Sequence, residues 1–488
     1  MYPNFQDLNK LIEQDLHEKK YFSKQSWSFP KQYNGQKVYD VIIVGAGHSG
    51  LALAHQLRLL GIGRILILDK QSIDKPGPWS SFARMEKLRT SKYSQGPECG
   101  NPLLSFKFWI NSLKGPNAFE DIDFIKTVDW ANYLSWFRDI LKIDVVSETE
   151  VLYQHWNSDA NSFEITALNG GKDKNYYASF LCFATGMIAC GGWEAPSNLV
   201  KNIDPNKIGY AWKNIDFSEL SGKTLAVIGG GASAFDNALM ASKHGATCSD
   251  IISRRKIPDG RPLSEKLWLG RSDDQIFPDE ETYPADMTNP ILRFTNTLEK
   301  DLYLDVIENF FLDGRTTSRP EYQRQFQNIE GLNVYDGVGE IAITESDDKG
   351  KYRIKSRLGF DKTYDYLILA TGPRYDLALR REYSSISDEI LTWGDINDKI
   401  KLFDIEALPK LTDEYQIQFK TDNPAATKLY CLTDFVHLTV GIPALANVVE
   451  KISRSIANAL YLDNSKKIVA YMAELNNQEE TCDDSRCS

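Results

Sequence analysis

A glycine pattern that occurs twice in the 488-residue chain constrains its fold more than any other feature. In the first copy, Gly45, Gly47 and Gly50 follow the apolar run 39–44 and precede segment 51–60, which has the pattern of a helix. Glycines in such a turn let a pyrophosphate approach the backbone at the N-terminus of the following helix. The pattern predicts a Rossmann-like domain that binds a dinucleotide, and an ordinary glycine turn of an α/β domain is the alternative.

A second apolar run supports the dinucleotide prediction. Residues 64–68 have the pattern of the next strand of the same unit, and this run ends at Asp69. A carboxylate in this place accepts hydrogen bonds from the hydroxyl groups of a ribose. This order of strand, glycine turn, helix, strand and terminal acid indicates a dinucleotide site far more specifically than the glycines alone.

The second copy repeats this order. The apolar run 223–228 leads into a turn that contains Gly229, Gly231, Ser233 and Ala234. Alanine at the third fingerprint position still permits close packing of the helix on the strand. The chain is therefore predicted to hold two dinucleotides.

The second copy differs from the first at the end of its second strand. Residues 248–253 have the pattern of that strand, and Arg254 and Arg255 follow it in place of an acid. Guanidinium groups bind a phosphate through paired, charge-assisted hydrogen bonds, whereas an acid would repel the 2′-phosphate of NADPH. We therefore expect NADPH at this site, and a solvated basic turn is the alternative.

Composition favours an enzyme and excludes other classes. A net charge of −11 argues against binding to nucleic acid or to an anionic membrane surface. The sequence contains no apolar run of membrane-spanning length and begins without the basic and apolar regions of a signal peptide. We expect a cytoplasmic protein without a membrane partner.

The cysteines and histidines do not form a recognisable motif. None of the seven cysteines belongs to a Cys-x-x-Cys pair, so we expect no dithiol of the type that disulfide reductases use. The six histidines lack metal-ligand spacing, and we expect no metal site.

Two matching segments indicate how the domains are arranged. Apolar strands end in Ala-Thr-Gly at 184–186 and again at 370–372, as expected where one domain interrupts another. The fold class predicted is α/β, with two Rossmann-like domains and the NAD(P) domain inserted in the FAD domain. The predicted segments are an N-terminal extension (1–37), the FAD domain (38–195 and 375–475), the NAD(P)H domain (196–374) and a polar tail (476–488).

Residues 257–330 form a predicted insertion in the second domain. Aromatic residues alternate there with charges and prolines after the strand–helix–strand unit is complete. The insertion could cover the cleft between the domains, where ligands of such folds bind, or it could be a small helical subdomain with its own aromatic core.

These motifs carry a family resemblance. The two fingerprints, the two Ala-Thr-Gly strands, the Gly-Pro-Trp at 77–79 and the segment 88–92 resemble the two-domain flavoprotein monooxygenases over roughly residues 38–465. That group includes flavin-containing monooxygenases, Baeyer–Villiger monooxygenases and amine N-hydroxylases. The resemblance implies FAD on the first fingerprint and NADPH on the second.

The resemblance also implies further site residues. Those expected to contact the flavin cofactor are Trp79, Arg89 and Asp434, and those expected to take part in catalysis are Ser91, Lys92 and His437. Each of the polar side chains among Arg89, Ser91, Lys92 and His437 can equally be a structural residue, because a single histidine or lysine is more often structural than catalytic.

Departures from the family patterns narrow the chemistry. No histidine follows 183–186 as the Baeyer–Villiger signature requires, which disfavours insertion of oxygen into ketones. Thr90 and Ser91 stand near the place of an asparagine in flavin-containing monooxygenases. Pro373 replaces the tyrosine of the N-hydroxylase motif.

The function implied is transfer of one oxygen atom from a flavin C4a-hydroperoxide to a small organic substrate at nitrogen or sulfur. The partners are then O₂ and that substrate. The sequence leaves open whether the chain forms a homo-oligomer. The alternatives are an NAD(P)H-dependent flavoprotein reductase and a flavoprotein that senses redox state without catalysis, because both would share every cofactor motif.

Overall fold

The structure is a computed structural model. It describes residues 2–22, 26–186, 189–257, 302, 305, 329–346, 350–396, 406–432, 442 and 445–484, and only the backbone from 476 onward. Asp434, His437 and nearly all of the predicted insertion 257–330 lie outside the described residues.

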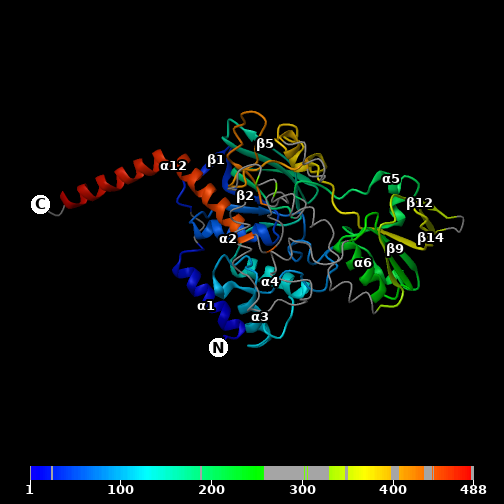
Figure 1. Cartoon of the computed structure of the whole chain (residues 1–488). Helices are drawn as coiled ribbons and strands as arrows, with labels where there is room; N and C mark the ends of the chain where they lie inside the picture. Colours follow the sequence, from blue (N-terminus) through cyan, green and yellow to red (C-terminus); the bar gives the residue numbers. More distant parts are fainter. Residues whose placement is uncertain are drawn as a thin grey trace.

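An eight-stranded sheet forms the centre of the larger lobe (Figure 1). Its main path runs in the order β4-β3-β2-β7-β6-β5, and β1 and β16 pair with β2 and β7. Strands β4, β3, β2, β7 and β16 are parallel to one another, whereas β1, β5 and β6 pair with their neighbours antiparallel. The bounds are β1 (Lys31–Tyr33), β2 (Gln36–Val44), β3 (Ile65–Leu68), β4 (Val145–Val146), β5 (Thr149–Asn157), β6 (Ser162–Asn169), β7 (Lys172–Phe183) and β16 (Leu429–Cys431).

A second sheet of five parallel strands lies in the smaller lobe, in the order β11-β10-β9-β15-β8. A three-stranded antiparallel sheet, β12-β13-β14, accompanies it. All these strands fall between β7 and β16 of the first sheet, so the smaller lobe interrupts the larger one, as predicted. The bounds are β8 (Gly209–Tyr210), β9 (Thr224–Ile228), β10 (Cys248–Ile252), β11 (Leu332–Tyr335), β12 (Ile341–Glu345), β13 (Tyr352–Ser356), β14 (Asp361–Tyr364) and β15 (Tyr366–Leu369).

The described helices cover these sheets. Helix α2 packs against β2, β3 and α12 in the larger lobe, and α6 packs against β9, β10 and β11 in the smaller one. The α-helices are α1 (Phe5–Glu18), α2 (His48–Leu59), α3 (Phe106–Lys114), α4 (Thr127–Ile140), α5 (Ser197–Val200), α6 (Ala232–Lys243), α11 (Trp393–Ile396) and α12 (Leu445–Asp484). The 3₁₀ turns are η1 (Pro102–Leu104), η2 (Pro205–Lys207), η3 (Phe217–Leu220), η5 (Leu377–Leu379) and η6 (Arg381–Tyr383).

The N-terminal extension packs on the body of the same chain. Its helix α1 buries Leu8, Ile12 and Leu16 completely, and the helix lies against α3 and α4. The side chain of Asn4 caps its N-terminus by accepting a hydrogen bond from the backbone of Asp7. The helix thus buries one apolar stripe against the body.

A buried ion pair joins the extension to the central sheet. Asp40 on β2 lies 3.0 Å from the guanidinium of Arg64, and both residues are buried. The hydroxyl groups of Ser26 and Ser28 donate to the second carboxylate oxygen of Asp40 at 2.6 and 2.9 Å. Both carboxylate oxygens thus accept hydrogen bonds, which is the condition under which a buried charge is tolerated.

We predict that Asp40→Ala destabilises the protein by about 3–5 kcal/mol, because it leaves the Arg64 guanidinium buried without its charge partner. Chemical denaturation measures the free energy of unfolding. Asp361→Ala is the matched control, since it removes an exposed ion pair with Arg353 and should cost about 1 kcal/mol or less. Equal losses in the two variants would contradict the prediction.

Candidate functional site

The first glycine turn has no room for side chains at two positions. Gly45 has a φ of +108°, and a Cβ there would lie 2.4 Å from the carbonyl oxygen of Ala184. A Cβ on Gly50 would lie 1.9 Å from the carbonyl oxygen of Gly45. Gly47 differs, because the closest atom to its Cβ would be Cα of Gly77 at 3.7 Å. Gly47 therefore faces the open side of the turn.

Helix α2 begins at this turn without a side-chain cap. Its N-cap residue is Gly47, and its first turn contains no acidic residue. Helix α3, by contrast, is capped by the hydroxyl of Ser105. The first N–H groups of a helix need an acceptor, and the helix dipole favours an anion there. The start of α2 therefore fits a pyrophosphate.

His48 lies in the same turn but adds no positive charge. Burial lowers the pKa of His48 to about 3, and its ring stacks on Trp130 with centroids 5.3 Å apart. The imidazole is therefore neutral at physiological pH. Backbone N–H groups and the helix dipole, and not an imidazolium, provide the attraction for a phosphate here.

Asp69 ends β3 beside the glycine turn. Its carboxylate accepts hydrogen bonds from the backbone N–H groups of Ala46 and Gln71. Burial raises the pKa of Asp69, and these two hydrogen bonds oppose the shift. A carboxylate has about four acceptor positions, so two remain for the hydroxyl groups of a ribose.

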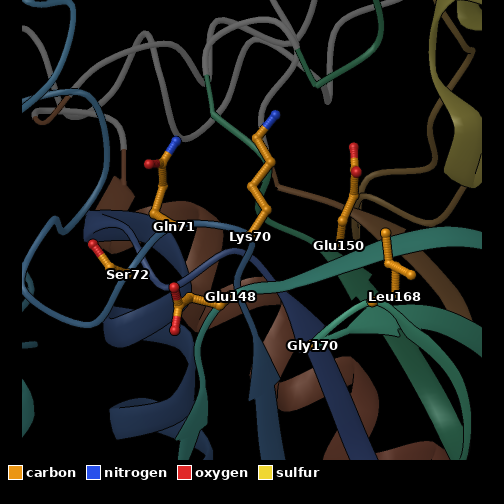
Figure 2. A pocket seen from close by; sticks show the side chains of 8 residues that line it. Lys70, Gln71, Ser72, Glu148, Glu150, Leu168 and Gly170 are labelled. Atoms are coloured by element: carbon orange, nitrogen blue, oxygen red, sulfur yellow. The ribbon is translucent and has the colours of Figure 1, made fainter.

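A pocket of about 460 Å³ lies directly beyond Asp69 (Figure 2). Figure 2 shows the side chains of Lys70 and Gln71 extending in the same direction, away from the strands. The volume is in the range of small-molecule sites and fits the adenosine part of a dinucleotide. Its lining residues are Lys70, Gln71, Ser72, Glu148, Glu150, Leu168, Gly170 and Gly171.

No pattern in the sequence predicts this pocket. Its walls come from the segment after β3, the start of β5 and the turn between β6 and β7, which are adjacent only in the folded sheet. The one available signal was the position of Lys70 immediately after the predicted ribose-binding acid.

Trp79 lies close to the first glycine turn, where the resemblance placed a flavin-contacting residue. Its indole lies 3.4 Å from a Cβ built on Gly77, and Gly77 in turn faces Gly47. The Trp79 indole nitrogen is buried and has no hydrogen-bond partner among the described residues. A buried N–H group without an acceptor fits a site in which a bound cofactor accepts its hydrogen bond.

The second glycine turn has the same geometry as the first. Gly229 has a φ of +147°, and a Cβ there would lie 2.2 Å from the carbonyl oxygen of Ala370. Gly231 caps α6 without a side chain, and nothing lies within 4 Å of the place of its Cβ. Ala234 is fully buried and Ser233 is exposed at the start of the helix. The start of α6 therefore fits a second pyrophosphate.

The two arginines after β10 are both exposed, but they differ in their side-chain contacts. Arg254 forms an exposed ion pair with Glu340 at 2.9 Å. Arg255 is exposed and has no side-chain partner in the described part of the chain. Exposed ion pairs contribute little free energy, so Arg254 can exchange Glu340 for a phosphate.

The loop of residues 84–89, called here the interlobe loop, joins the two lobes. The Arg89 guanidinium forms an ion pair with Asp236 on α6. Glu86 accepts from Lys243, also on α6, at 2.6 Å. Arg89 is therefore bound to the second lobe, and its predicted contact with the flavin cofactor is disfavoured while this pair is intact.

Further contacts between the two lobes involve Arg84, Phe82 and Trp193. Arg84 donates to the carbonyl oxygen of Lys213. Trp193, in the segment that crosses between the lobes, stacks on Trp212 with ring centroids 5.5 Å apart, and Phe82 meets Trp193 edge-on. Ion pairs and aromatic stacking together hold the lobes in one relative orientation.

Lys92, for which the resemblance implies a catalytic role, contacts backbone carbonyl groups. Its ammonium donates to the carbonyl oxygens of Phe119 at 3.0 Å and Ile122 at 2.9 Å, and its side chain is largely buried. These hydrogen bonds suit the structural alternative for Lys92, and its catalytic role stays a prediction. Ser91 is also buried, and its hydroxyl oxygen accepts from the backbone of Tyr93 at 3.2 Å. Its catalytic role stays a prediction.

Two thiols that belong to no Cys-x-x-Cys motif lie close together in the folded chain. Cys190 and Cys431 are 241 positions apart in sequence, yet their sulfur atoms lie 3.5 Å apart. Sequence spacing could not reveal the pair, because β16 brings Cys431 back to the first sheet. Both residues are buried, so this pair cannot exchange with a protein disulfide on the surface.

Two other expectations concern absences. No group of three or more potential metal-ligating side chains occurs within the described ranges. No helix among those residues is long and apolar enough to cross a membrane.

Comparison with known proteins agrees with this geometry. Residues 42–269 match the family model described as pyridine nucleotide-disulphide oxidoreductase. The chain is 26% identical over 465 residues to the FAD-dependent urate hydroxylase of Xanthomonas campestris pv. campestris, a match that covers 92% of each chain.

Solved structures match over most of the chain as well. The ornithine hydroxylase of Pseudomonas aeruginosa superimposes with a TM-score of 0.61 at 17% identity, over 87% of this chain and 99% of that one. The FAD-bound cadaverine monooxygenase of Erwinia amylovora gives 0.60 at 16% identity, over 86% and 95%. The ornithine N-hydroxylase of Kutzneria sp. 744, with reduced FAD and NADP⁺, gives 0.61 at 15% identity, over 88% and 100%.

The chain has the fold of the two-domain flavoprotein monooxygenases. The predicted fold class is thereby confirmed. Two of these solved structures hold the cofactors that the fingerprints predict, FAD in one and reduced FAD with NADP⁺ in the other. In this flavoprotein fold, the uncapped start of α2 fits the pyrophosphate of FAD, and that of α6 fits the pyrophosphate of NADPH.

We predict that Gly47→Val abolishes FAD binding. The φ of Gly47 is −75°, which valine adopts without strain, so the added side chain acts only by filling the space before α2. Visible absorption of the purified protein measures bound flavin, and circular dichroism checks that the variant is folded. A folded Gly47→Val protein with stoichiometric FAD would sink the assignment.

We predict that Arg254→Ala/Arg255→Ala weakens NADPH binding without changing NADH binding. A charge-assisted hydrogen bond contributes roughly 1.5–3 kcal/mol, so each arginine should account for about a ten- to hundredfold change. Glu340→Gln is the matched variant and should tighten NADPH binding up to about fivefold, because it releases Arg254. Titration of both coenzymes measures this, and an unchanged preference in the double variant would show that the arginines are only surface charge.

Proposed function

We propose that this chain is an FAD- and NADPH-dependent monooxygenase that transfers one oxygen atom from O₂ to a nitrogen atom of a small organic substrate. The observation that carries the proposal is the pair of uncapped helix starts, on α2 and α6, in lobes that the interlobe loop holds together. This arrangement suits transfer of a hydride from one bound dinucleotide to the other.

The solved neighbours support nitrogen as the acceptor atom. They include hydroxylases of ornithine and an L-lysine 6-monooxygenase of Pseudomonas syringae, with a TM-score of 0.60 at 13% identity. FAD, when bound, supplies the chemistry that activates O₂. The residues of this chain bind and orient the two cofactors and exclude water from the space between them.

The residues named above have defined parts in this proposal. Backbone N–H groups at Gly47 hold the FAD pyrophosphate, and Asp69 accepts from the ribose. Trp79 donates its indole N–H toward the flavin cofactor, and Arg255 holds the 2′-phosphate of NADPH. Ser91, Lys92 and His437 stay proposed catalytic residues, and Arg89 and Asp434 stay proposed flavin contacts.

A second candidate is hydroxylation at carbon. The relative that matches 92% of this chain is named a urate hydroxylase, and its identity of 26% exceeds that of the structural neighbours. A purine or a related nitrogen heterocycle is therefore a second substrate class. The two candidates share both cofactors and O₂, and they differ only in the atom that receives oxygen.

We also propose a cytoplasmic location and the domain boundaries near residues 195 and 374. The boundaries are supported by the strand order, since β8 to β15 form sheets separate from the first.

We predict that Asp236→Ala slows reduction of the flavin by NADPH without loss of FAD. The substitution removes the charge partner of Arg89 and loosens the junction of the lobes, and a small misplacement of reacting groups costs on the order of tenfold to a hundredfold in rate. Anaerobic rapid mixing measures the rate, with Lys362→Ala, an ion-pair variant inside the smaller lobe, as the control. A normal rate in Asp236→Ala would exclude a positioning role for this pair.

The proposed function is tested by oxygen transfer. Primary amines, amino acids, purines and low-molecular-weight disulfides are supplied with NADPH and ¹⁸O₂, and product mass is recorded. We expect one ¹⁸O atom in a product derived from an amine, with NADPH consumption that depends on that substrate. An ¹⁸O atom on a purine carbon would establish the second candidate, and reduction of a disulfide without label would establish a reductase.

A further inference from the structure

The thiol pair of Cys190 and Cys431 lies where the chain first leaves the larger lobe. Cys190 belongs to the core of that lobe, and Gly191 and Gly192 follow it directly. Gly192 exchanges two backbone hydrogen bonds of 2.9 Å with Arg374, where the chain returns from the smaller lobe. The outgoing and the returning segment are therefore paired immediately after Cys190.

The two crossing segments pack too closely to admit a side chain at Gly191. A Cβ on Gly191 would lie 2.3 Å from the carbonyl oxygen of Arg374 and 2.9 Å from Cα of Tyr375. Contacts between backbones at this distance leave the outgoing segment little freedom. The position of Cys190 is therefore set by the crossing as well as by the core of the larger lobe.

Cys431 approaches Cys190 from the central sheet. It ends β16, which pairs in parallel with β7 and places Cys431 opposite Phe183. Both cysteines are buried free thiols, and their sulfur atoms lie 3.5 Å apart. A disulfide bond would bring the sulfur atoms roughly 1.5 Å closer. Rotation of the two side chains about their Cα–Cβ bonds can produce a movement of this size.

The Tyr383 side chain lies beside both thiols. Burial, and then the thiols of Cys431 and Cys190, raise the pKa of Tyr383 well above its ordinary value. Its hydroxyl is therefore un-ionised and can donate a hydrogen bond to sulfur. Such a bond favours the thiolate form of a cysteine, which is the nucleophile in thiol oxidation. Tyr383 can thus assist the loss of a thiol proton inside the core.

We propose that Cys190 and Cys431 form a reversible disulfide in response to hydrogen peroxide, which is small enough to enter a site closed to a protein disulfide. One thiolate attacks a peroxide oxygen, the O–O bond breaks, and a sulfenic acid and water form. The second sulfur then displaces the sulfenic hydroxyl group, which leaves as water while the S–S bond forms. The two sulfur atoms lose two electrons in total, the peroxide gains them, and both thiol protons end in water.

The bond would join the two ends of the inserted lobe to each other. The chain between Cys190 and Cys431 contains all the strands from β8 to β15. In the reduced protein, the outgoing segment is held to β16 without a covalent bond. A disulfide resists local opening at this crossing, and a cross-link across so long a loop also restricts the unfolded chain. Peroxide would therefore strengthen the junction of the lobes.

The first test is the identity of the bond in the full-length, FAD-containing protein. Accessible thiols are blocked with N-ethylmaleimide, hydrogen peroxide is added, and peptides from the unreduced protein are analysed by mass spectrometry. We expect one linked pair of peptides that contain Cys190 and Cys431, with the loss of two hydrogen atoms and release by dithiothreitol. Free thiols at both positions, under conditions that fully oxidise glutathione, would overturn the proposal. A bond from either cysteine to Cys182 would also overturn it.

The second test is the effect of the bond on the crossing. In the wild type, peroxide should slow hydrogen exchange of the backbone at 189–194 by at least about tenfold and raise the melting temperature. Cys190→Ala and Cys431→Ala should abolish both effects. Cys182→Ala, at a buried position of the same core, is the matched control and should retain them.

Other outcomes of the second test decide against the proposal. A disulfide that forms without slower exchange at 189–194 would overturn its role at the crossing, and so would effects that persist in Cys190→Ala. If an alanine variant does not fold, the wild type before and after dithiothreitol still gives both readouts. None of these measurements depends on the activity proposed above, because the peroxide is added from outside.

Discussion

The structure depends on one interaction, the attraction of an uncapped helix N-terminus for a phosphate. It occurs twice, at Gly47 on α2 and at Gly231 on α6, and in neither helix does a side chain or a first-turn acid satisfy the N–H groups. Two features of the glycine turns follow from the need to place a backbone close to a pyrophosphate. Gly45 and Gly229 have positive φ values, and carbonyl oxygens occupy the space where their side chains would be.

Two lobes built on this interaction must also keep a fixed orientation. The interlobe loop provides the fixed contact, through the ion pairs of Glu86 and Arg89 with α6. The Arg89 pair is largely buried, so it is screened less than the many exposed pairs of the surface. The same loop continues into Lys92, whose ammonium is tied to backbone carbonyls, which makes the loop a stiff connection between the lobes.

Local patterns explain why much of the fold was predictable. Gly45, Gly50 and Asp69 lie within one strand–helix–strand unit, so their geometry is determined by residues close in sequence. The partners of Arg89 and Cys190 are 147 and 241 positions away, and no local pattern indicates such contacts. For the same reason, the hydrogen bonds of Lys92 to the carbonyl oxygens of Phe119 and Ile122 have no signal in the local sequence. The pocket beyond Asp69 was missed because three separate segments form it.

The central claim is that two bound dinucleotides exchange a hydride across the junction of the lobes. The most direct measurement is anaerobic mixing of the purified, FAD-containing protein with NADPH and, separately, with NADH, while flavin absorbance is followed. The account predicts complete bleaching of the bound FAD by one equivalent of NADPH, with much slower reduction by NADH. A protein that carries FAD but is reduced by neither coenzyme would contradict the account.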